Sequence, residues 1–310
     1  IVRPVAYIPH HRDAERLGRT LRSLAEGTRP LDVVVVDNGS SDGSAELVRE
    51  EFPEVALLEL GENLGFGRAI NRAVAAHPGD PVILLNDDVE CEPRFAEALL
   101  DAAAEGAECV AGVLTQEANP GLIDSAGVVA DRTLMGFDYL HGEPLEAARE
   151  APDPLGPSGG AALYRLDAFQ ATGGFDERIF LYYEDLDLAL RLRAHGGRCR
   201  LAPEARALHA YSASSGAASG FKYSHSGWSR GYMLRRYSVT AHPATALRAL
   251  AAEATICAGQ LVKDHTAAGL AGRLRGWRDA AGLERRDTGD APLLDISLRE
   301  ALRRRRRRRG

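Results

Sequence analysis

Four short apolar runs alternate with helix-like segments in the first 85 residues, and this alternation constrains the fold more than any other feature of the chain. The runs are predicted to be buried strands: Val5–Ile8 (stopped by Pro9), Val33–Val36, Val55–Leu60 and Val82–Leu85. Helices are expected after the first three runs: from a cap at Asp13, over about 44–51, and over Arg68–Ala76. Repeated strand–helix units predict an open, mostly parallel α/β sheet flanked by helices.

The remainder of the chain suggests a second unit. Ser212–Ser219 is rich in Ser, Ala and Gly, and we expect it to be mobile. Beyond it, helical patterns dominate to the end of the chain. We therefore predict an α/β domain at 1–215 and a helical C-terminal extension with a polybasic tail at 216–310.

Acidic residues and a histidine follow several of the predicted strands. Asp37 comes directly after the second run, Asp87 and Asp88 after the fourth, and His209 after a later strand. Ligands of open α/β sheets bind at the carboxyl ends of strands. Two carboxylates and an imidazole can hold a hard divalent cation, and a further carboxylate, such as Asp185 in an acidic helix start, can act as a base. A reaction that transfers a chemical group from a diphosphate requires these two components, a divalent cation and a base.

Five ordered motifs carry a resemblance to a known family. They are Val34–Ser44, Glu62–Gly67 with Asn71, Asn86–Asp88, Gly173–Glu177 with Tyr183–Arg191, and Pro203–His209. Together they resemble the family-two inverting glycosyltransferases with the GT-A fold, over about residues 1–212. This fold combines a Rossmann-like nucleotide-binding half with an acceptor half. The branch that the motifs resemble most is the rhamnosyltransferase-like enzymes of bacterial cell-surface polysaccharide synthesis.

The resemblance implies specific roles at the metal and at the base. Asp88 is the expected carboxylate ligand of Mg²⁺ or Mn²⁺, His209 a second ligand, and Asp87 would face the ribose. Asp185 matches the general base, which takes a proton from the acceptor hydroxyl. Each assignment has a structural alternative: a polar turn for Asp87 and Asp88, a structural histidine for His209, and capping of the helix dipole for Glu184 and Asp185.

The resemblance also implies a nucleotide site. Its candidate residues are Pro9, His10, Asp37, Asn63, Arg68, Asp87 and Gly160. Asp37 needs a partner, which is a nucleobase N–H, a turn N–H, or both. Arg68 is either a phosphate contact or an exposed helix charge. The chain departs from the family at His10-His11-Arg12, where a small hydroxyl residue, an aromatic residue and Asn are usual, so the nucleobase stays open.

Charge is unevenly placed along the chain. The net charge is −6, but Arg303–Arg309 are seven consecutive arginines, and without them residues 1–302 carry −13. The tail is a solvated end, an anchor for anionic lipid, or a nucleic-acid contact. A polybasic stretch gains roughly 1 kcal/mol per residue at an anionic leaflet. The acidic body argues against nucleic acid as a partner.

Other features bear on location and assembly. The four cysteines are scattered, which favours a reduced, cytoplasmic setting, and neither a signal peptide nor a membrane-spanning run is recognised. We expect a cytoplasmic protein with peripheral contact to the inner face of the membrane, and a homodimer is a further expectation.

The function we predict is metal-dependent, inverting transfer of a sugar from a nucleoside diphosphate sugar, with dTDP-rhamnose as one donor, to a glycan or lipid-linked acceptor. A catalytically silent nucleotide-sugar-binding or scaffolding protein is the alternative. A Rossmann oxidoreductase is disfavoured because no G-x-G-x-x-G follows the first strand.

Overall fold

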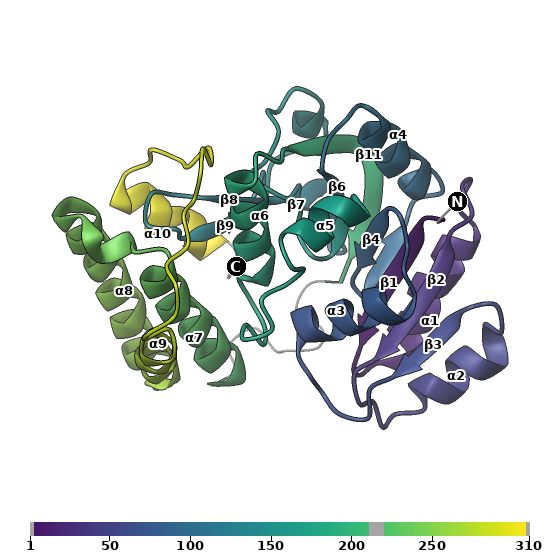
Figure 1. The fold of residues 1–310 in the computed structure, drawn as a ribbon, viewed down its shortest axis with the longest axis horizontal. Coiled ribbons are helices and arrows are strands. Elements are labelled where there is room, and N and C mark those ends of the chain that lie inside the picture. Colours follow the sequence, from purple (N-terminus) through teal and green to yellow (C-terminus); the bar gives the residue numbers. More distant parts are fainter. Residues whose placement is uncertain (1–2, 211–219, 308–310) are drawn as a thin grey trace.

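The computed structural model describes residues 3–210 and 220–307, and in them a curled, nine-stranded sheet is flanked by helices (Figure 1). Eight strands follow the order β3-β2-β1-β4-β10-β6-β11-β5, and β7 pairs with β6 at the side. The predicted α/β fold class is therefore confirmed. The predicted mobile segment Ser212–Ser219 lies outside the described residues.

The N-terminal half of the sheet is parallel, as the strand–helix alternation predicts. Its elements are β1 (Val5–His10), α1 (Ala14–Ala25), β2 (Asp32–Asp37), α2 (Ser44–Glu51), β3 (Ala56–Glu59), α3 (Phe66–Ala76) and β4 (Val82–Leu85). Helices cover both faces, so all four residues of β4 are fully buried. One detail of the prediction was wrong: Pro9 does not stop β1, because the strand pairs with β2 up to His10 opposite Asp37.

The second half of the sheet is mixed rather than parallel. Its elements are β5 (Val89–Cys91), α4 (Phe95–Ala104), β6 (Cys109–Gln116), β7 (Asn119–Ser125), β10 (Ala161–Tyr164), α5 (Leu166–Ala171), α6 (Glu184–Ala194) and β11 (Cys199–His209). The strand β10 is antiparallel to both β4 and β6, and β11 is parallel to β6 but antiparallel to β5. A small separate sheet pairs β8 (Val128–Ala130) with β9 (Gly136–Asp138).

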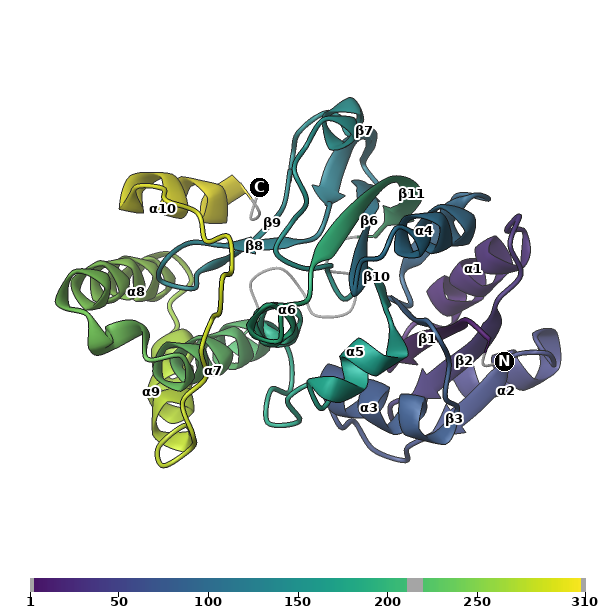
Figure 2. The ribbon, with the colours of Figure 1, turned by 45° about the horizontal axis from the view of Figure 1, so that its top comes forward.

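Helices make up most of the C-terminal region, as predicted. They are α7 (Gly220–Arg236), α8 (Pro243–Lys263), α9 (Ala268–Asp279) and α10 (Leu298–Arg307), and they gather beside α6 and the β8–β9 sheet (Figures 1 and 2). Helices α7 and α9 approach closely at glycines. A Cβ on Gly231 would lie 2.0 Å from the Arg273 carbonyl oxygen, and one on Gly276 would overlap the Trp228 carbonyl. The boundary at residue 215 stays a prediction.

A buried ion-pair network joins these helices to the sheet domain. Arg230 on α7 and Arg273 on α9 both pair with Glu253 on α8, at 2.6 and 2.5 Å. Arg230 also donates to the carbonyl oxygens of Thr133 and Leu134, between β8 and β9. Breaking such a buried pair leaves an uncompensated charge, so this network fixes the helices against the β8–β9 turn. Within the described residues, no helix has the length and apolar character needed to cross a bilayer.

Candidate functional site

Strand pairing brings together Asp88 and His209, which are far apart in the sequence. Asp88 lies between β4 and β5, and β5 pairs with β11 so that Val89 is opposite His209. The Ala210 N–H also donates to the Asp88 carbonyl oxygen, at 3.0 Å. As a result His209 Nε2 lies 3.3 Å from Asp88 Oδ1, and both side chains are largely buried.

A third residue, Asp124 at the end of β7, was not singled out from the sequence. Its Oδ2 accepts a hydrogen bond from His209 Nδ1 at 2.7 Å, and its Oδ1 lies 3.4 Å from His141 Nδ1. Burial raises the pKa of Asp124, but the hydrogen bonds from His141 and His209 outweigh it and hold the pKa well below the ordinary value. Burial lowers the pKa of His209, but the neighbouring carboxylates of Asp124 and Asp88 raise it to about 10. Asp124 thus fixes which nitrogen of His209 faces Asp88.

This geometry fits a divalent cation between Asp88 and His209. Asp88 Oδ1 is buried and accepts no hydrogen bond from the described residues. Because Asp124 engages Nδ1 of His209, Nε2 would be the ligating atom, and it would release its proton when an ion binds. A carboxylate on the other ring nitrogen is common at metal-binding histidines. In the described part of the chain, no three Asp, Glu, His or Cys side chains form a metal cage. Phosphate oxygens and water would therefore complete the coordination, as Mg²⁺ prefers.

Replacing Asp124 with Asn should weaken metal binding without removing a ligand. Loss of an outer-shell carboxylate typically costs about 10- to 100-fold in metal affinity. Calorimetric titration of Mn²⁺ in the presence of a nucleoside diphosphate would measure this. The exposed Glu117→Gln variant is the control for loss of a nearby carboxylate, and equal Mn²⁺ affinity in Asp124→Asn and the control would contradict the role.

His10 lies inside the protein rather than on its surface. Its ring is 1% exposed, with Nδ1 2.6 Å from Asp87 Oδ2 and Nε2 2.7 Å from Ser44 Oγ. Burial raises the pKa of Asp87, and the hydrogen bond with His10 opposes that rise. The geometry favours a role for His10 in holding Asp87, and the predicted contact between His10 and the nucleobase would require the ring to move.

The other predicted nucleotide residues lie along the carboxyl edge of the parallel strands. Asp37 is buried and accepts a hydrogen bond from the Ser40 N–H at 2.7 Å, so a turn N–H is one of its partners. Pro9 is half-buried in β1, opposite Val36. Gly160 precedes β10, and its carbonyl oxygen accepts from the Asn86 N–H.

Asn63 and Arg68 are engaged with neighbouring loops. The Asn63 side chain accepts a hydrogen bond from the Asn38 side chain at 3.2 Å. Arg68 is partly exposed and lies 3.5 Å from a carboxylate oxygen of Glu177, in the loop before α6. The same loop receives Asn71, whose side chain makes two hydrogen bonds of 2.9 Å with the Phe175 backbone. An ion pair and hydrogen bonds therefore connect the motif segments around 63–71 and 173–177.

Asp185 lies in the first turn of α6 and is half-buried. Tyr182 and Tyr183 precede the helix with φ values of 69° and 72°, a left-handed conformation that is rare for bulky residues and is found mostly at functional sites. The Phe180 carbonyl oxygen accepts from the Phe66 N–H at 3.0 Å. Phe66 in turn packs near Gly159, beside Gly160 and Asn86. This chain of contacts links the start of α6 to the segment that carries Asp88.

Comparisons with known proteins agree with this geometry. A model of the family described as "Glycosyl transferase family 2" matches residues 6–173, more than half of the chain. The N-acetylglucosaminyl-diphospho-decaprenol L-rhamnosyltransferase of Mycobacterium tuberculosis (strain ATCC 25618 / H37Rv) is 36% identical over 221 residues, covering 62% of this chain and 71% of that protein. Succinoglycan biosynthesis protein ExoA of Rhizobium meliloti (strain 1021) is 30% identical over 199 residues, covering 62% of this chain and 58% of that protein.

Two solved structures share the fold. The mannosyltransferase PcManGT from Pyrobaculum calidifontis, in complex with GDP-Man and Mn2+, has a TM-score of 0.54 at 20% identity, covering 91% of this chain and 87% of that one. GalNAc-T7, with UDP, GalNAc and Mn2+, has a TM-score of 0.62 at 14% identity, covering 92% of this chain and 55% of that one. At these identities the two likenesses establish the fold alone. With the family match, they lead to one conclusion: the chain belongs to glycosyl transferase family 2 and is a glycosyltransferase with a GT-A-type fold.

Proposed function

We propose that the protein catalyses metal-dependent, inverting transfer of a sugar from a nucleoside diphosphate sugar to a glycan or lipid-linked acceptor. The observation that carries this proposal is the buried pair of Asp88 Oδ1 and His209 Nε2, at the edge where Asp37 and Asp87 also lie. A bound Mg²⁺ or Mn²⁺ ion would neutralise the charge that develops on the departing nucleoside diphosphate.

The chain's own residues supply the remaining steps. Asp88 and His209 would hold the ion, with Asp124 fixing the orientation of the imidazole. Asp87, held by His10, would bind the ribose, and Asp37 the nucleobase. Asp185 would take the proton from the acceptor hydroxyl as its oxygen attacks the anomeric carbon. Attack from the face opposite the leaving group inverts the configuration at that carbon.

The printed names of two relatives support a choice of substrates to propose. One relative is named as a rhamnosyltransferase that acts on a diphospho-decaprenol-linked sugar, and another as a protein of succinoglycan synthesis. We therefore propose a polyprenyl-linked glycan as acceptor in cell-surface polysaccharide synthesis, and dTDP-rhamnose as the first donor to test. A thermal-shift panel of nucleoside diphosphates and nucleotide sugars, with and without Mn²⁺, would identify the base, because a ligand that binds the native state raises its melting temperature.

We further propose cytoplasmic residence at the inner face of the membrane. In the described residues, the exposed large apolar side chains are Phe221, Leu247, Leu250, Leu261, Val262, Leu270 and Leu274. All of them lie in α7–α9, and four line the outer side of α8. The basic tail follows in α10, where Arg303 and Arg304 pair with Glu300, and Arg308 and Arg309 lie outside the described residues. Exposed apolar side chains and a cationic helix each favour binding to an anionic lipid surface.

Truncation after Leu302 should lower binding to anionic vesicles, because each basic residue contributes roughly 1 kcal/mol at such a surface. Ala301 stays in place and is buried in the α8–α10 contact, so the fold should persist. Co-sedimentation with vesicles rich in phosphatidylglycerol would measure the loss, and added salt should weaken the full chain as well. Equal sedimentation of the two chains would show that the tail is no anchor. Light scattering without vesicles would show whether the apolar side chains instead form the predicted homodimer.

A further inference from the structure

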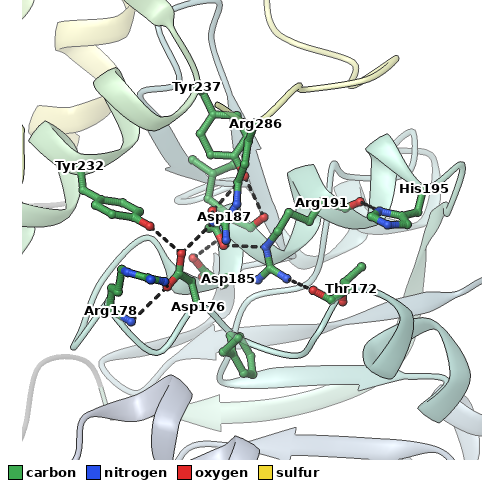
Figure 3. Close-up of polar contacts among 12 residues, drawn as sticks. Thr172, Asp176, Arg178, Asp185, Asp187, Arg191, His195, Tyr232, Tyr237 and Arg286 are labelled. Carbon is green, nitrogen blue, oxygen red and sulfur yellow. Dashed lines mark hydrogen bonds and ion pairs between the residues drawn. The ribbon is translucent and has the colours of Figure 1, made fainter. Parts of the chain in front are cut away.

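A buried carboxylate lies two residues after the proposed base. Asp187 on α6 has no exposed surface. It accepts hydrogen bonds from Arg191 Nε at 2.8 Å and from the Tyr237 hydroxyl at 2.9 Å (Figure 3). Its third partner comes from the C-terminal region: Arg286 Nη1 lies 2.5 Å from Asp187 Oδ1. Arg286 follows α9 in the chain and is partly buried.

The same guanidinium nitrogen also pairs with Asp176, which precedes the proposed base Asp185 in the sequence. Arg286 Nη1 lies 2.9 Å from Asp176 Oδ2. The Tyr232 hydroxyl of α7 donates to that same oxygen at 2.7 Å, and the Arg178 N–H donates to Asp176 Oδ1 at 3.1 Å. Asp176 lies in the motif before α6, and Asp187 lies within α6. Arg286 therefore joins the two ends of the segment that contains Asp185 (Figure 3).

The position of Arg286 is itself fixed. Its backbone N–H donates to the Arg236 carbonyl oxygen, at the end of α7, at 2.8 Å. Burial lowers the pKa of Arg286, but the charges of Asp187 and Asp176 raise it far above the ordinary value. Desolvation of Asp176 is likewise outweighed by Tyr232 and the nearby arginines, so its pKa is lowered. Arg286 and Asp176 are therefore both charged in this bridge.

Helix geometry connects this bridge to Asp185. At 3.6 residues per turn, positions 185 and 187 point to roughly opposite sides of a helix. Holding Asp187 in the bridge therefore fixes the rotation of α6 about its axis, and with it the position of Asp185. The strained turn at Tyr182–Tyr183 lies between Asp176 and Asp185, so an anchor on both sides is needed to keep its conformation.

We propose that Arg286 is a positioning residue for the base, so that the C-terminal extension forms part of the catalytic unit. The inference rests on the proposed function, in which Asp185 is the base. A purely structural bridge would stabilise the protein and leave turnover of the folded enzyme unchanged. The two roles separate because removing Arg286 leaves Asp187 with Arg191 and Tyr237, and leaves Asp176 with Tyr232 and Arg178.

The test compares Arg286→Met and Arg286→Lys with Arg285→Met in the full chain. Arg285 is the adjacent, exposed arginine and bonds to the Arg235 carbonyl oxygen, so it is a matched control. Transfer would be measured well below each variant's melting temperature. We expect kcat to fall about 10- to 100-fold in Arg286→Met, the cost of a small misplacement of a catalytic group. Donor affinity with Mn²⁺ should match the control, Arg286→Lys should recover part of the loss, and millimolar methylguanidine should restore Arg286→Met in part.

Each outcome has one meaning. A lower melting temperature with kcat equal to that of Arg285→Met would overturn the positioning role and leave a structural bridge. If Arg286→Met does not fold, Arg286→Lys decides instead: a kcat below that of Arg285→Met supports the positioning role, and a kcat equal to it counts against that role. If the parent transfers no sugar from any nucleotide sugar, the proposed function fails. A working parent with an unaffected Arg286→Met rejects this inference alone.

Discussion

Asp185→Asn should lower turnover about 10²–10⁴-fold, the usual worth of general base catalysis. Asn keeps the shape of the side chain and can still accept from the Leu186 N–H, which lies 2.7 Å from Asp185 Oδ1, but it cannot take the proton of the acceptor hydroxyl. Donor binding should survive, because the metal and nucleotide residues lie on other elements. Steady-state transfer rates and donor calorimetry would separate the two effects.

Glu184→Gln is the companion variant for this experiment. Glu184 is buried in the same helical turn. Its replacement therefore tests whether the loss of any negative charge at the start of α6 is enough to lower turnover. We expect a milder fall in turnover, because acidic residues at a helix N-terminus complement the dipole. A near-normal rate for Asp185→Asn, or loss of donor binding in that variant, would show that another residue is the base.

Asp88→Ala should abolish Mn²⁺-dependent binding of nucleoside diphosphates without unfolding the domain. The Asp88 side chain lies 3.3 Å from His209 Nε2, and after the replacement His209 keeps its hydrogen bond to Asp124. The replacement also removes one of the two proposed protein ligands, and among the described residues no three Asp, Glu, His or Cys side chains form a metal site. Calorimetry of the donor with and without Mn²⁺ would measure the loss.

Glu90→Ala is the control for Asp88→Ala. Glu90 lies on β5, two residues later, and makes a partly exposed ion pair with Arg19 at 3.3 Å. Such pairs contribute little stability, about 0–1 kcal/mol. Glu90→Ala should therefore bind donor and metal as the parent does. Equal Mn²⁺-dependent affinity for the donor in Asp88→Ala and Glu90→Ala would show that Asp88 is not a metal ligand.

The fold was predictable where local patterns decide it. The four-valine run at Val33–Val36 is typical of a strand covered on both faces, and in the structure it lies in β2. The cap at Asp13 likewise begins α1, where its side chain accepts from the Arg16 N–H. The antiparallel insertion of β10 between β4 and β6 was not predictable, because strand order depends on contacts between residues about 80 positions apart (β10 with β4) and about 50 positions apart (β10 with β6).

Some residues of the candidate site were likewise predictable from the sequence, and others were not. Asp88 and His209 were found through motifs, and the pairing of β5 with β11 brings them together. Asp124 was missed because it stands alone in an irregular segment, and its partner His209 is 85 positions away. Arg286 was missed for the same reason, since its two carboxylate partners lie about 100 residues earlier. His10 was assigned to the nucleotide from its place after Pro9, and its contacts with Asp87 and Ser44 were not predictable because those partners lie 77 and 34 positions away.

The most direct test of the account is a transfer assay with the full chain, a polyprenyl-linked acceptor and a panel of nucleoside diphosphate sugars, in Mn²⁺ and in EDTA. The account predicts that one donor releases its nucleoside diphosphate in step with glycosylation of the acceptor. It also predicts an inverted anomeric configuration in the product, and loss of the reaction in EDTA. Transfer that proceeds equally in EDTA, or a product with retained configuration, would contradict it.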